Sequence, residues 1–280
     1  MTTAAVRETA PLFSAWDVIE GMRVHSRVSD RAVIRYGRDG ATKGMLRAVV
    51  FVHGLGMSTR YLEPTMRLAA RDFAVSGLDL PGFGESKLRG RVLSLGELAR
   101  VLDLWLAARG IESPILVGQS HGCQVIVEHV VSAPRSGALV LNAPTMLAGH
   151  RSMAAQFARV ALDSSREPAA LVPHVLRDYV RAGPRRILTT LAGALADRIE
   201  EKLPRVAMPV TIVCGARDPV SPPAWGARLA RLTGSAVGGA GAELRVVAGA
   251  AHAVPFSHPE ALVAEIVAIA ARLDRAAAPA

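Results

Sequence analysis

The chain has 280 residues and a formal net charge of +9, and half of its residues are hydrophobic. A chain of this length and composition can bury one large core without a disulfide framework, so Cys123 and Cys214 are expected to be reduced and buried. Its arginines are interleaved with acidic residues and accompany no nucleic-acid motif, which argues against nucleic-acid binding. No apolar run has the length of a membrane span, and the first residues do not resemble a secretory signal, so we expect a cytoplasmic protein.

The first half of the chain predicts a hairpin, a strand and a helix. Alternating apolar residues within 22–37 predict an antiparallel hairpin, and the apolar run 48–52 predicts a buried strand. This strand leads into His53-Gly54-Leu55-Gly56, where the glycines allow backbone amides to face a bound oxygen anion. Residues 95–109 then show the apolar spacing of an amphipathic helix.

A serine stands between the next predicted strand and the next predicted helix. The apolar run 114–117 predicts the strand, and residues 123–131 have the length and spacing of a helix packed on a sheet. Between them lies Gly118-Gln119-Ser120-His121-Gly122. Small residues on both sides of the serine allow a sharp turn, from which the Ser120 hydroxyl points out of the sheet. This context favours a nucleophile over a serine that only forms a turn.

A helical insertion follows the strand predicted at 138–142. From 145 to 203 the sequence predicts helices broken at Pro168, Pro173, Gly183 and Pro184. The first of these helices places four apolar residues on one face: Met153, Phe157, Val160 and Ala161. Six arginines of the insertion are expected to form a solvated face, with a clamp for a substrate carboxylate as the alternative. They are Arg151, Arg159, Arg177, Arg181, Arg185 and Arg186.

Two polar residues follow the last predicted strands. The run 210–213 leads to Asp218, and the run 244–247 leads to His252 on a loop of small residues. A serine hydroxyl becomes an effective nucleophile only with a base, an acid that orients the base, and donors for the developing oxyanion. We therefore predict Ser120 as nucleophile, His252 as a base that titrates in the neutral range, and Asp218 as the acid. The predicted oxyanion donors are the amides of Leu55 and His121.

These motifs together resemble the α/β-hydrolase family. The resemblance rests on HGLG at 53–56, DLPGFGES at 79–86, GQSHG at 118–122, GARDP at 215–219 and a histidine near the C-terminus. The order serine, aspartate, histidine is the order of that family. Where many members carry a further glycine or proline, this chain has Met57, which is expected to narrow the acyl side of the pocket.

The resemblance implies the architecture as well as the chemistry. It predicts a mostly parallel sheet with helices on both faces and the site at the carboxyl ends of the strands. The core would comprise residues 1–144 and 204–280, and residues 145–203 would form a helical cap, or lid. Apolar side chains of this cap would line the substrate pocket, for which we select Met153, Phe157 and Tyr179.

Each site residue also has an alternative interpretation. Asp218 could cap the helix that begins near 222, and Asn142 ends a strand where some family members place the acid. His258 competes with His252 as the base, but a capping box at 257–260 assigns it to the start of the last helix, which is predicted to end near 274. His53 is expected to be a structural hydrogen-bonding residue, and Asp79 part of the loop architecture.

We expect hydrolysis of a small or medium carboxylic ester in two acyl-transfer steps, without a metal ion or cofactor. The alternatives are cleavage of carbon-carbon bonds in diketone-like ring-cleavage products, a cofactor-free haloperoxidase-like or acyl-transfer activity, and a ligand-binding receptor on the same fold. Ser120 disfavours the epoxide hydrolases and haloalkane dehalogenases of the family, whose nucleophile is aspartate. The partner expected is a small-molecule substrate, and the sequence leaves the oligomeric state open.

Overall fold

The computed structural model describes residues 9–35, 46–133, 136–234 and 241–277. Eight strands form one sheet in the order β1-β2-β4-β3-β5-β6-β7-β8. The first two strands pair antiparallel to each other and β2 pairs antiparallel to β4, whereas all pairs from β4 to β8 are parallel. The strands are β1 Leu12–Ile19, β2 Met22–Ser29, β3 Ala48–Val52, β4 Ala74–Leu78, β5 Ile115–Gln119, β6 Ala138–Asn142, β7 Val210–Gly215 and β8 Glu243–Val247.

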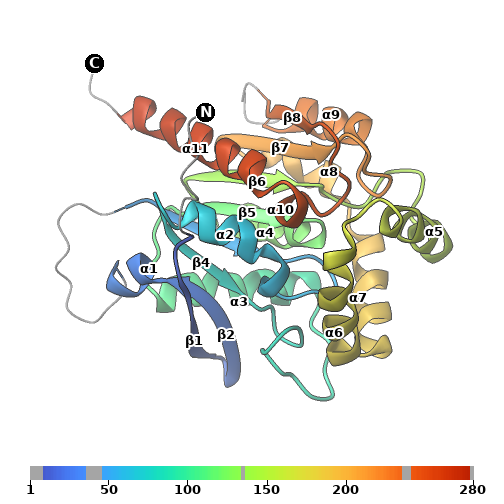
Figure 1. Cartoon of the computed structure of the whole chain (residues 1–280), viewed down its shortest axis with the longest axis horizontal. Helices are drawn as coiled ribbons and strands as arrows, with labels where there is room; N and C mark the ends of the chain where they lie inside the picture. Colours follow the sequence, from blue (N-terminus) through green and yellow to red (C-terminus); the bar gives the residue numbers. More distant parts are fainter. Residues whose placement is uncertain (1–8, 36–45, 134–135, 235–240, 278–280) are drawn as a thin grey trace, which may run out of the picture.

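Helices cover both faces of this sheet (Figure 1). Strands β3 to β7 are buried along their whole length, as expected for parallel strands with helices on both sides. Alternate residues of each strand enter opposite core layers, so Val50 and Val52 pack with one helix set, and Val49 and Phe51 with the other. The first set is α3 Leu95–Ala108, α4 His121–Ser132, α8 Ile199–Lys202 and α9 Pro223–Leu232. The second is α2 Glu63–Ala69, α10 Val254–Ser257 and α11 Pro259–Ala277.

The insertion between β6 and β7 is helical, as predicted. Its main helices are α5 Met153–Ser164, α6 Val172–Ala182 and α7 Pro184–Ala196, which lie together beyond one end of the sheet (Figure 1, right). Gly183 and Pro184 separate α6 from α7 as expected. Pro173 does not break a helix, because it occupies the first turn of α6, where its missing N–H has no intrahelical acceptor. Short 3₁₀ helices at Thr59–Leu62, Ala169–Leu171 and Leu203–Arg205 complete the described elements.

The N-terminal hairpin lies about ten residues earlier than predicted. It comprises β1 and β2, joined by Glu20 and Gly21, which both have positive φ angles of 48° and 76°. A two-residue turn with positive φ at both positions fits the right-handed twist of a hairpin. After β2 the chain forms the helix α1 Asp30–Arg35, because the Ser29 hydroxyl accepts a hydrogen bond from the Ala32 amide. The end of the predicted hairpin, 36–37, lies outside the described residues.

The predicted capping box at 257–260 is wrong. Ser257 is the last residue of α10, and its hydroxyl donates a hydrogen bond to the Ala253 carbonyl, one turn back. Helix α11 begins at Pro259, directly after His258, and continues to Ala277, three residues beyond the predicted end. The two cysteines are free and fully buried, as predicted, and the Cys123 thiol lies 3.3 Å from the Gly118 carbonyl oxygen.

Candidate active site

Ser120 lies on the sharp turn between β5 and α4. Its backbone angles, φ 55° and ψ −119°, fall in a region that residues with a side chain rarely adopt. Two hydrogen bonds fix this turn: the Ser120 amide donates to the Asn142 carbonyl at 2.9 Å, and the Cys123 amide donates to the Ser120 carbonyl at 3.0 Å. The strained geometry is therefore imposed by the neighbouring strand and by the first turn of the helix.

The glycines around Ser120 are required by close backbone approach. A Cβ atom on Gly118 would lie 2.8 Å from the Cys123 amide nitrogen, and one on Gly122 would lie 2.8 Å from the His53 carbonyl oxygen. Real Cβ contacts essentially never fall below 3.0 Å. These two positions allow β5, α4 and the end of β3 to converge, which brings the loop after β3 beside Ser120.

His252 and Asp218 form a hydrogen-bonded pair. His252 Nδ1 donates to Asp218 Oδ2 at 2.8 Å. The other oxygen of Asp218 accepts hydrogen bonds from the amides of Val220 and Ser221, at 2.7 and 2.9 Å, so the buried carboxylate is held by its own loop. Helix α9 begins only at Pro223, so Asp218 orients this loop and His252 rather than capping the helix.

Acidic side chains surround His252. Burial alone would lower the pKa of this histidine, but Asp218, with smaller contributions from Asp163 and Glu167, raises the pKa to about 9. The sequence predicts a pKa in the neutral range from the ordinary value of histidine, and it gives no sign of the contacts of Asp163 and Glu167 with this loop. Both belong to the insertion: Asp163 lies in α5, and Glu167 follows its end.

A hydrogen-bond chain connects the three loops of the site. The Gly54 amide donates to the Tyr61 hydroxyl at 3.1 Å, and this hydroxyl donates to Gln119 Oε1 at 2.6 Å. The amide group of Gln119 donates in turn to the His252 carbonyl at 3.2 Å. The residue before Ser120 thus contacts both the backbone of His252 and the loop of Leu55. The sequence gives no signal for the role of Tyr61, which comes from a short 3₁₀ helix.

The two predicted oxyanion donors lie on backbone turns that flank Ser120. His121 is the first residue of α4, so its amide has no acceptor within the helix. Leu55 lies in a tight turn in which the Met57 amide donates to the Gly54 carbonyl at 3.2 Å. His121 Nδ1 lies 2.9 Å from Gln124 Oε1, and burial, opposed by this hydrogen bond, lowers the pKa of His121.

His53 has the structural role expected of it. The Leu80 amide donates to His53 Nε2 at 2.9 Å, which leaves the proton on Nδ1, and Nδ1 donates to the Gly54 carbonyl at 2.8 Å. Asp79 is likewise structural, since its carboxylate accepts hydrogen bonds from His25 and from the backbone and hydroxyl of Thr59.

The alternative site residues do not join the His252 pair. His258 Nδ1 lies 2.9 Å from the hydroxyl of its neighbour Ser257 rather than beside a carboxylate. The side chain of Asn142 is buried and has no hydrogen-bond partner among the described residues, whereas its carbonyl oxygen accepts from Ser120. The histidine that contacts an acid near Ser120 is therefore His252.

The four predicted pocket residues have different surroundings. Met57 is buried, and Tyr179 of α6 lies over the loop after β3, where a Cβ on Gly56 would be 2.7 Å from its ring. Met153 packs in a different, smaller apolar cluster that also includes Leu55. Phe157 is 52% exposed, because the face of α5 that turns inward is the one that carries Gln156 and Asp163.

Most of the six arginines bind other parts of the chain, so they do not form one solvated face. Arg177 and Arg181 contact Glu85 at 3.0 and 2.6 Å, and Arg151 contacts Glu200 at 2.6 Å. Arg186 donates to the carbonyls of Leu88 and Arg91, Arg159 donates to that of Pro219, and Arg185 is exposed. Apart from the Arg151–Glu200 pair, which lies within the insertion, these contacts tie the insertion to the loops after β4 and β7.

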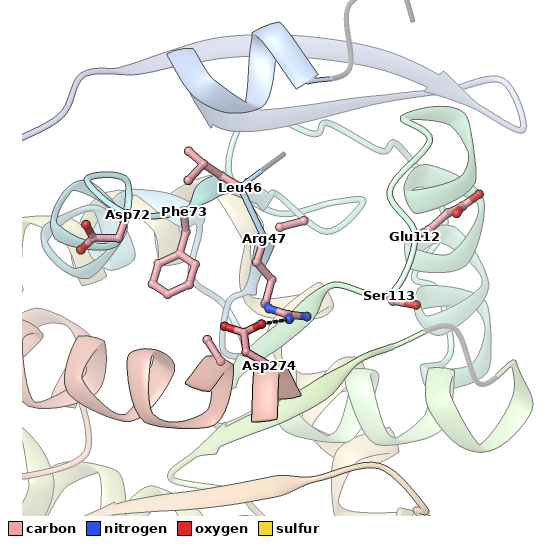
Figure 2. Close-up of a pocket in the computed structure, with 9 residues that line it drawn as sticks. Leu46, Arg47, Asp72, Phe73, Glu112, Ser113 and Asp274 are labelled. Carbon is pink, nitrogen blue, oxygen red and sulfur yellow. Dashed lines mark hydrogen bonds and ion pairs between the residues drawn. The ribbon is translucent and has the colours of Figure 1, made fainter. Parts of the chain in front are cut away.

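A cavity of about 530 Å³ lies at the opposite end of the sheet from Ser120. Arg47 and Ser113, which line it, come before β3 and β5, whereas Ser120 follows β5. Figure 2 shows Arg47 reaching Asp274 of α11 in this cavity, where the two form an ion pair at 2.5 Å. The cavity therefore has no access to the candidate site. Within the described ranges, no cluster of His, Cys, Asp and Glu could hold a metal ion, and no helix is long and apolar enough to cross a membrane.

A mostly parallel eight-stranded sheet with a serine on the turn after β5 defines an architecture that many hydrolases share. The chain belongs to the alpha/beta hydrolase family, whose sequence pattern it matches over residues 49–266. This confirms both the family and the fold class predicted from the motifs.

Relatives and similar structures include hydrolases of several kinds. The chain is 28% identical over 251 residues to a pimeloyl-[acyl-carrier protein] methyl ester esterase of Neisseria meningitidis serogroup B, covering 78% of this chain and 91% of the relative. A putative lipase from Acinetobacter baumannii matches with a TM-score of 0.75 and 13% identity, over 94% of this chain and 92% of the other. The 2-hydroxy-6-oxo-6-phenylhexa-2,4-dienoate hydrolase of a Rhodococcus species matches with a TM-score of 0.72 and 17% identity, over 94% and 100%. At these identities the two structures show the fold alone.

Proposed function

We propose that the protein is a serine hydrolase of small or medium carboxylic esters, with Ser120 as nucleophile, His252 as base and Asp218 as the orienting acid. The observation that carries the proposal is the 2.8 Å hydrogen bond from His252 Nδ1 to Asp218 Oδ2, beside the strained turn of Ser120. This hydrogen bond leaves Nε2 as the nitrogen that can accept the serine proton. A substrate of small molecular size is the only partner that the proposal requires.

The reaction proceeds in two balanced steps. His252 Nε2 takes the Ser120 proton while the hydroxyl oxygen attacks the ester carbonyl, and the resulting oxyanion accepts hydrogen bonds from the amides of Leu55 and His121. The intermediate collapses when the alcohol leaves with the proton from His252. A water molecule then loses a proton to His252 and attacks the carbonyl of the acyl-enzyme. When the second tetrahedral intermediate collapses, His252 returns this proton to Ser120 Oγ, which releases the acid and restores the serine hydroxyl. Asp218 favours the imidazolium that forms in each step.

The surroundings of Ser120 support an acyl group with some apolar surface. Met57 and Tyr179 belong to one apolar cluster, and the Tyr179 ring lies against Gly56 of the oxyanion loop. Leu55 packs with Met153 in a second apolar cluster. We further propose that residues 145–203 act as a lid over a core of 1–144 and 204–280. An ester substrate is also the chemistry named for the Neisseria relatives, although their acyl group need not be that of this chain. Buried free thiols suit a reducing compartment such as the cytoplasm.

Intact-mass analysis with a fluorophosphonate probe tests the nucleophile. The wild type should gain one probe adduct, and Ser120→Ala should gain none and lose ester turnover by a factor on the order of 10⁶. Ser132→Ala is the matched control, because Ser132 is an exposed serine at the other end of the same helix. Adducts on Ser120→Ala would overturn the assignment of the nucleophile.

A substrate screen then tests the reaction class. We expect turnover of simple esters with acyl chains of graded length, and a change of chain-length preference in Tyr179→Ala and Met153→Ala. Phe157→Ala serves as the control on the exposed side of α5 and should leave this preference unchanged. Turnover of vinylogous diketones without ester turnover would replace the esterase by a carbon-carbon bond hydrolase. An unlabelled wild type would instead favour a ligand-binding protein.

A further inference from the structure

The loop that carries His252 is held by two acidic residues of the insertion. The His252 amide donates to Asp163 Oδ1 at 3.1 Å, and the Ala253 amide donates to Glu167 Oε1 at 2.6 Å. These bonds join residues 89 and 86 positions apart in the sequence. His252 is therefore fixed from two sides, by Asp218 and Gln119 of the core and by two carboxylates of the cap segment.

Burial makes these two carboxylates unusual. Asp163 is 8% exposed, and the second oxygen of Glu167 is buried without a hydrogen-bond partner among the described residues. Ionised carboxylates are costly to bury unless a positive charge or several donors compensate them. Each accepts one backbone hydrogen bond here, and Arg166 and a protonated His252 are the positive groups that favour the charged form of Asp163. A neutral amide side chain could accept the same backbone hydrogen bonds at a lower cost.

We propose that Asp163 and Glu167 are positioning residues for the base: they hold the His252 loop under the cap, and their charge favours the imidazolium that forms during acyl transfer. The assignment rests on the proposed function, in which His252 is the base. Neither residue touches the reacting atoms in this proposal, since both act through His252.

The electrostatics of the site agree with this geometry. Asp218 from the loop after β7 and the two cap carboxylates together outweigh the effect of burial and raise the pKa of His252 to about 9. Burial, in turn, raises the pKa of both Asp163 and Glu167, and the nearby histidine charge opposes that rise. Asp163, Glu167 and His252 therefore titrate as a coupled group, in which the imidazolium is favoured while the two cap carboxylates stay ionised.

Conservative amide variants separate the charge from the hydrogen bond. Asp163→Asn and Glu167→Gln keep an oxygen that can accept from the His252 and Ala253 amides, but they remove the negative charge. If the two residues only attach the cap segment to the core, these variants should leave the pKa of His252 unchanged. Glu85→Gln is the matched control, because Glu85 also joins the core to the cap, through Arg177 and Arg181, but makes no contact with the His252 loop.

The decisive measurement is the titration of the His252 ring by NMR, with His252→Gln used to assign the resonance. We expect each amide variant to lower the His252 pKa and the double variant to lower it by about one unit, while Glu85→Gln leaves it at the wild-type value. The acid limb of ester turnover should move to lower pH by the same amount, and the plateau rate at high pH should fall several-fold. An unchanged pKa in the double variant, or an equal shift in Glu85→Gln, would overturn the proposal.

The same experiment distinguishes failure of this proposal from failure of the proposed function. If the wild type is neither labelled by the fluorophosphonate nor active on esters, the esterase proposal is wrong. The NMR titration still decides whether Asp163 and Glu167 act on His252. Asp163→Ala and Glu167→Ala provide the complementary test of the hold on the loop. Both alanine variants should speed hydrogen exchange of the backbone amides at 252 and 253. Exchange rates equal to those of the wild type would contradict the proposal that the two carboxylates hold this loop.

Discussion

Ser120 adopts backbone angles that glycine adopts far more readily, with φ 55° and ψ −119°. Such backbone strain costs on the order of 1–3 kcal/mol. Glycine at this position would relieve the strain, but it would also raise the conformational entropy of the unfolded chain, which offsets part of the gain in stability. We expect Ser120→Gly to be about 1 kcal/mol more stable than Ser120→Ala, with both variants inactive. Urea unfolding measures the difference. Equal stability of the two variants would show that the turn carries no strain.

Gly122 is the second residue whose size matters. An added Cβ would contact the backbone of Val52 and His53, which belongs to the central strand and the loop that follows it, so neither can move aside cheaply. Gly122→Ala should destabilise the fold by about 3 kcal/mol, as overpacking of a core does. Gly193→Ala on α7 is the control, since a Cβ there has no heavy atom within 4 Å and should stabilise the helix by about 0.5–1 kcal/mol. A gain of stability at both positions would show that helix propensity outweighs the close backbone approach at Gly122.

The raised pKa of His252 also affects stability. A pKa near 9 in the folded state, against an ordinary value of 6.5, means that the protonated ring stabilises the fold. This contribution is fully present below pH 6.5 and is lost as the pH rises through about 9. We expect a stability difference between wild type and His252→Gln that is largest near pH 6, on the order of 3 kcal/mol at most, and that disappears at high pH. Melting temperatures across this range measure it, and a difference that grows with pH would contradict the sign.

At the scale of elements, the cap is attached by ion pairs of modest strength. Glu85 binds Arg177 and Arg181 of α6, and all three side chains are about one-third exposed. Glu85→Gln should therefore lower global stability by no more than about 1 kcal/mol, but it should speed amide exchange in α6 several-fold. Glu20→Gln is the control, because it removes a comparably exposed pair with Arg100 far from the cap. Faster exchange in α6 of both variants would mean that the effect is general.

The elements predicted best from the sequence are those with a local signal. Buried strands and the loops that follow them could be placed because apolar runs end in glycine-rich segments, as around Ser120. The hairpin was misplaced because Ser29 and Asp30, which start a helix, interrupt the alternation of 22–37, and because Glu20-Gly21 is a weaker turn signal than Asn-Gly.

Other features had no local signal. The spacing of apolar residues predicts an apolar face on α5, but it does not show which part of the protein this face packs against. Phe157 on this helix is half exposed. The contacts of Asp163 and Glu167 with the His252 loop depend on how the insertion folds back over the core, across more than 80 residues. Spacing within a helix carries no information on such long-range pairing, so the electrostatics of His252 could be found only in three dimensions.

At the scale of the whole molecule, the sheet separates two helix layers (Figure 1). The layer with α3 and α4 includes Cys123, and the same layer includes Cys214 at the end of β7, next to the loop of Asp218. Cys123 lies on α4, which follows β5, and Cys214 lies in β7. Because β6 lies between β5 and β7 in the sheet, the two thiols report on elements on either side of β6.

The native fold protects both thiols from chemical modification. Burial raises the pKa of the Cys214 thiol to about 12 and holds that of Cys123 well above its usual range, so the reactive thiolate is scarce at both sites. An alkylating reagent can modify a buried thiol only after the structure around that thiol has opened. The number of adducts on each chain at a given time therefore records how many of its two thiols have been exposed. Chains that pass directly from zero to two adducts indicate that the two halves of the sheet open as one unit. Accumulation of chains with one adduct, on Cys214, would show that β7 and β8 open before the rest of the sheet, together with the loop of Asp218.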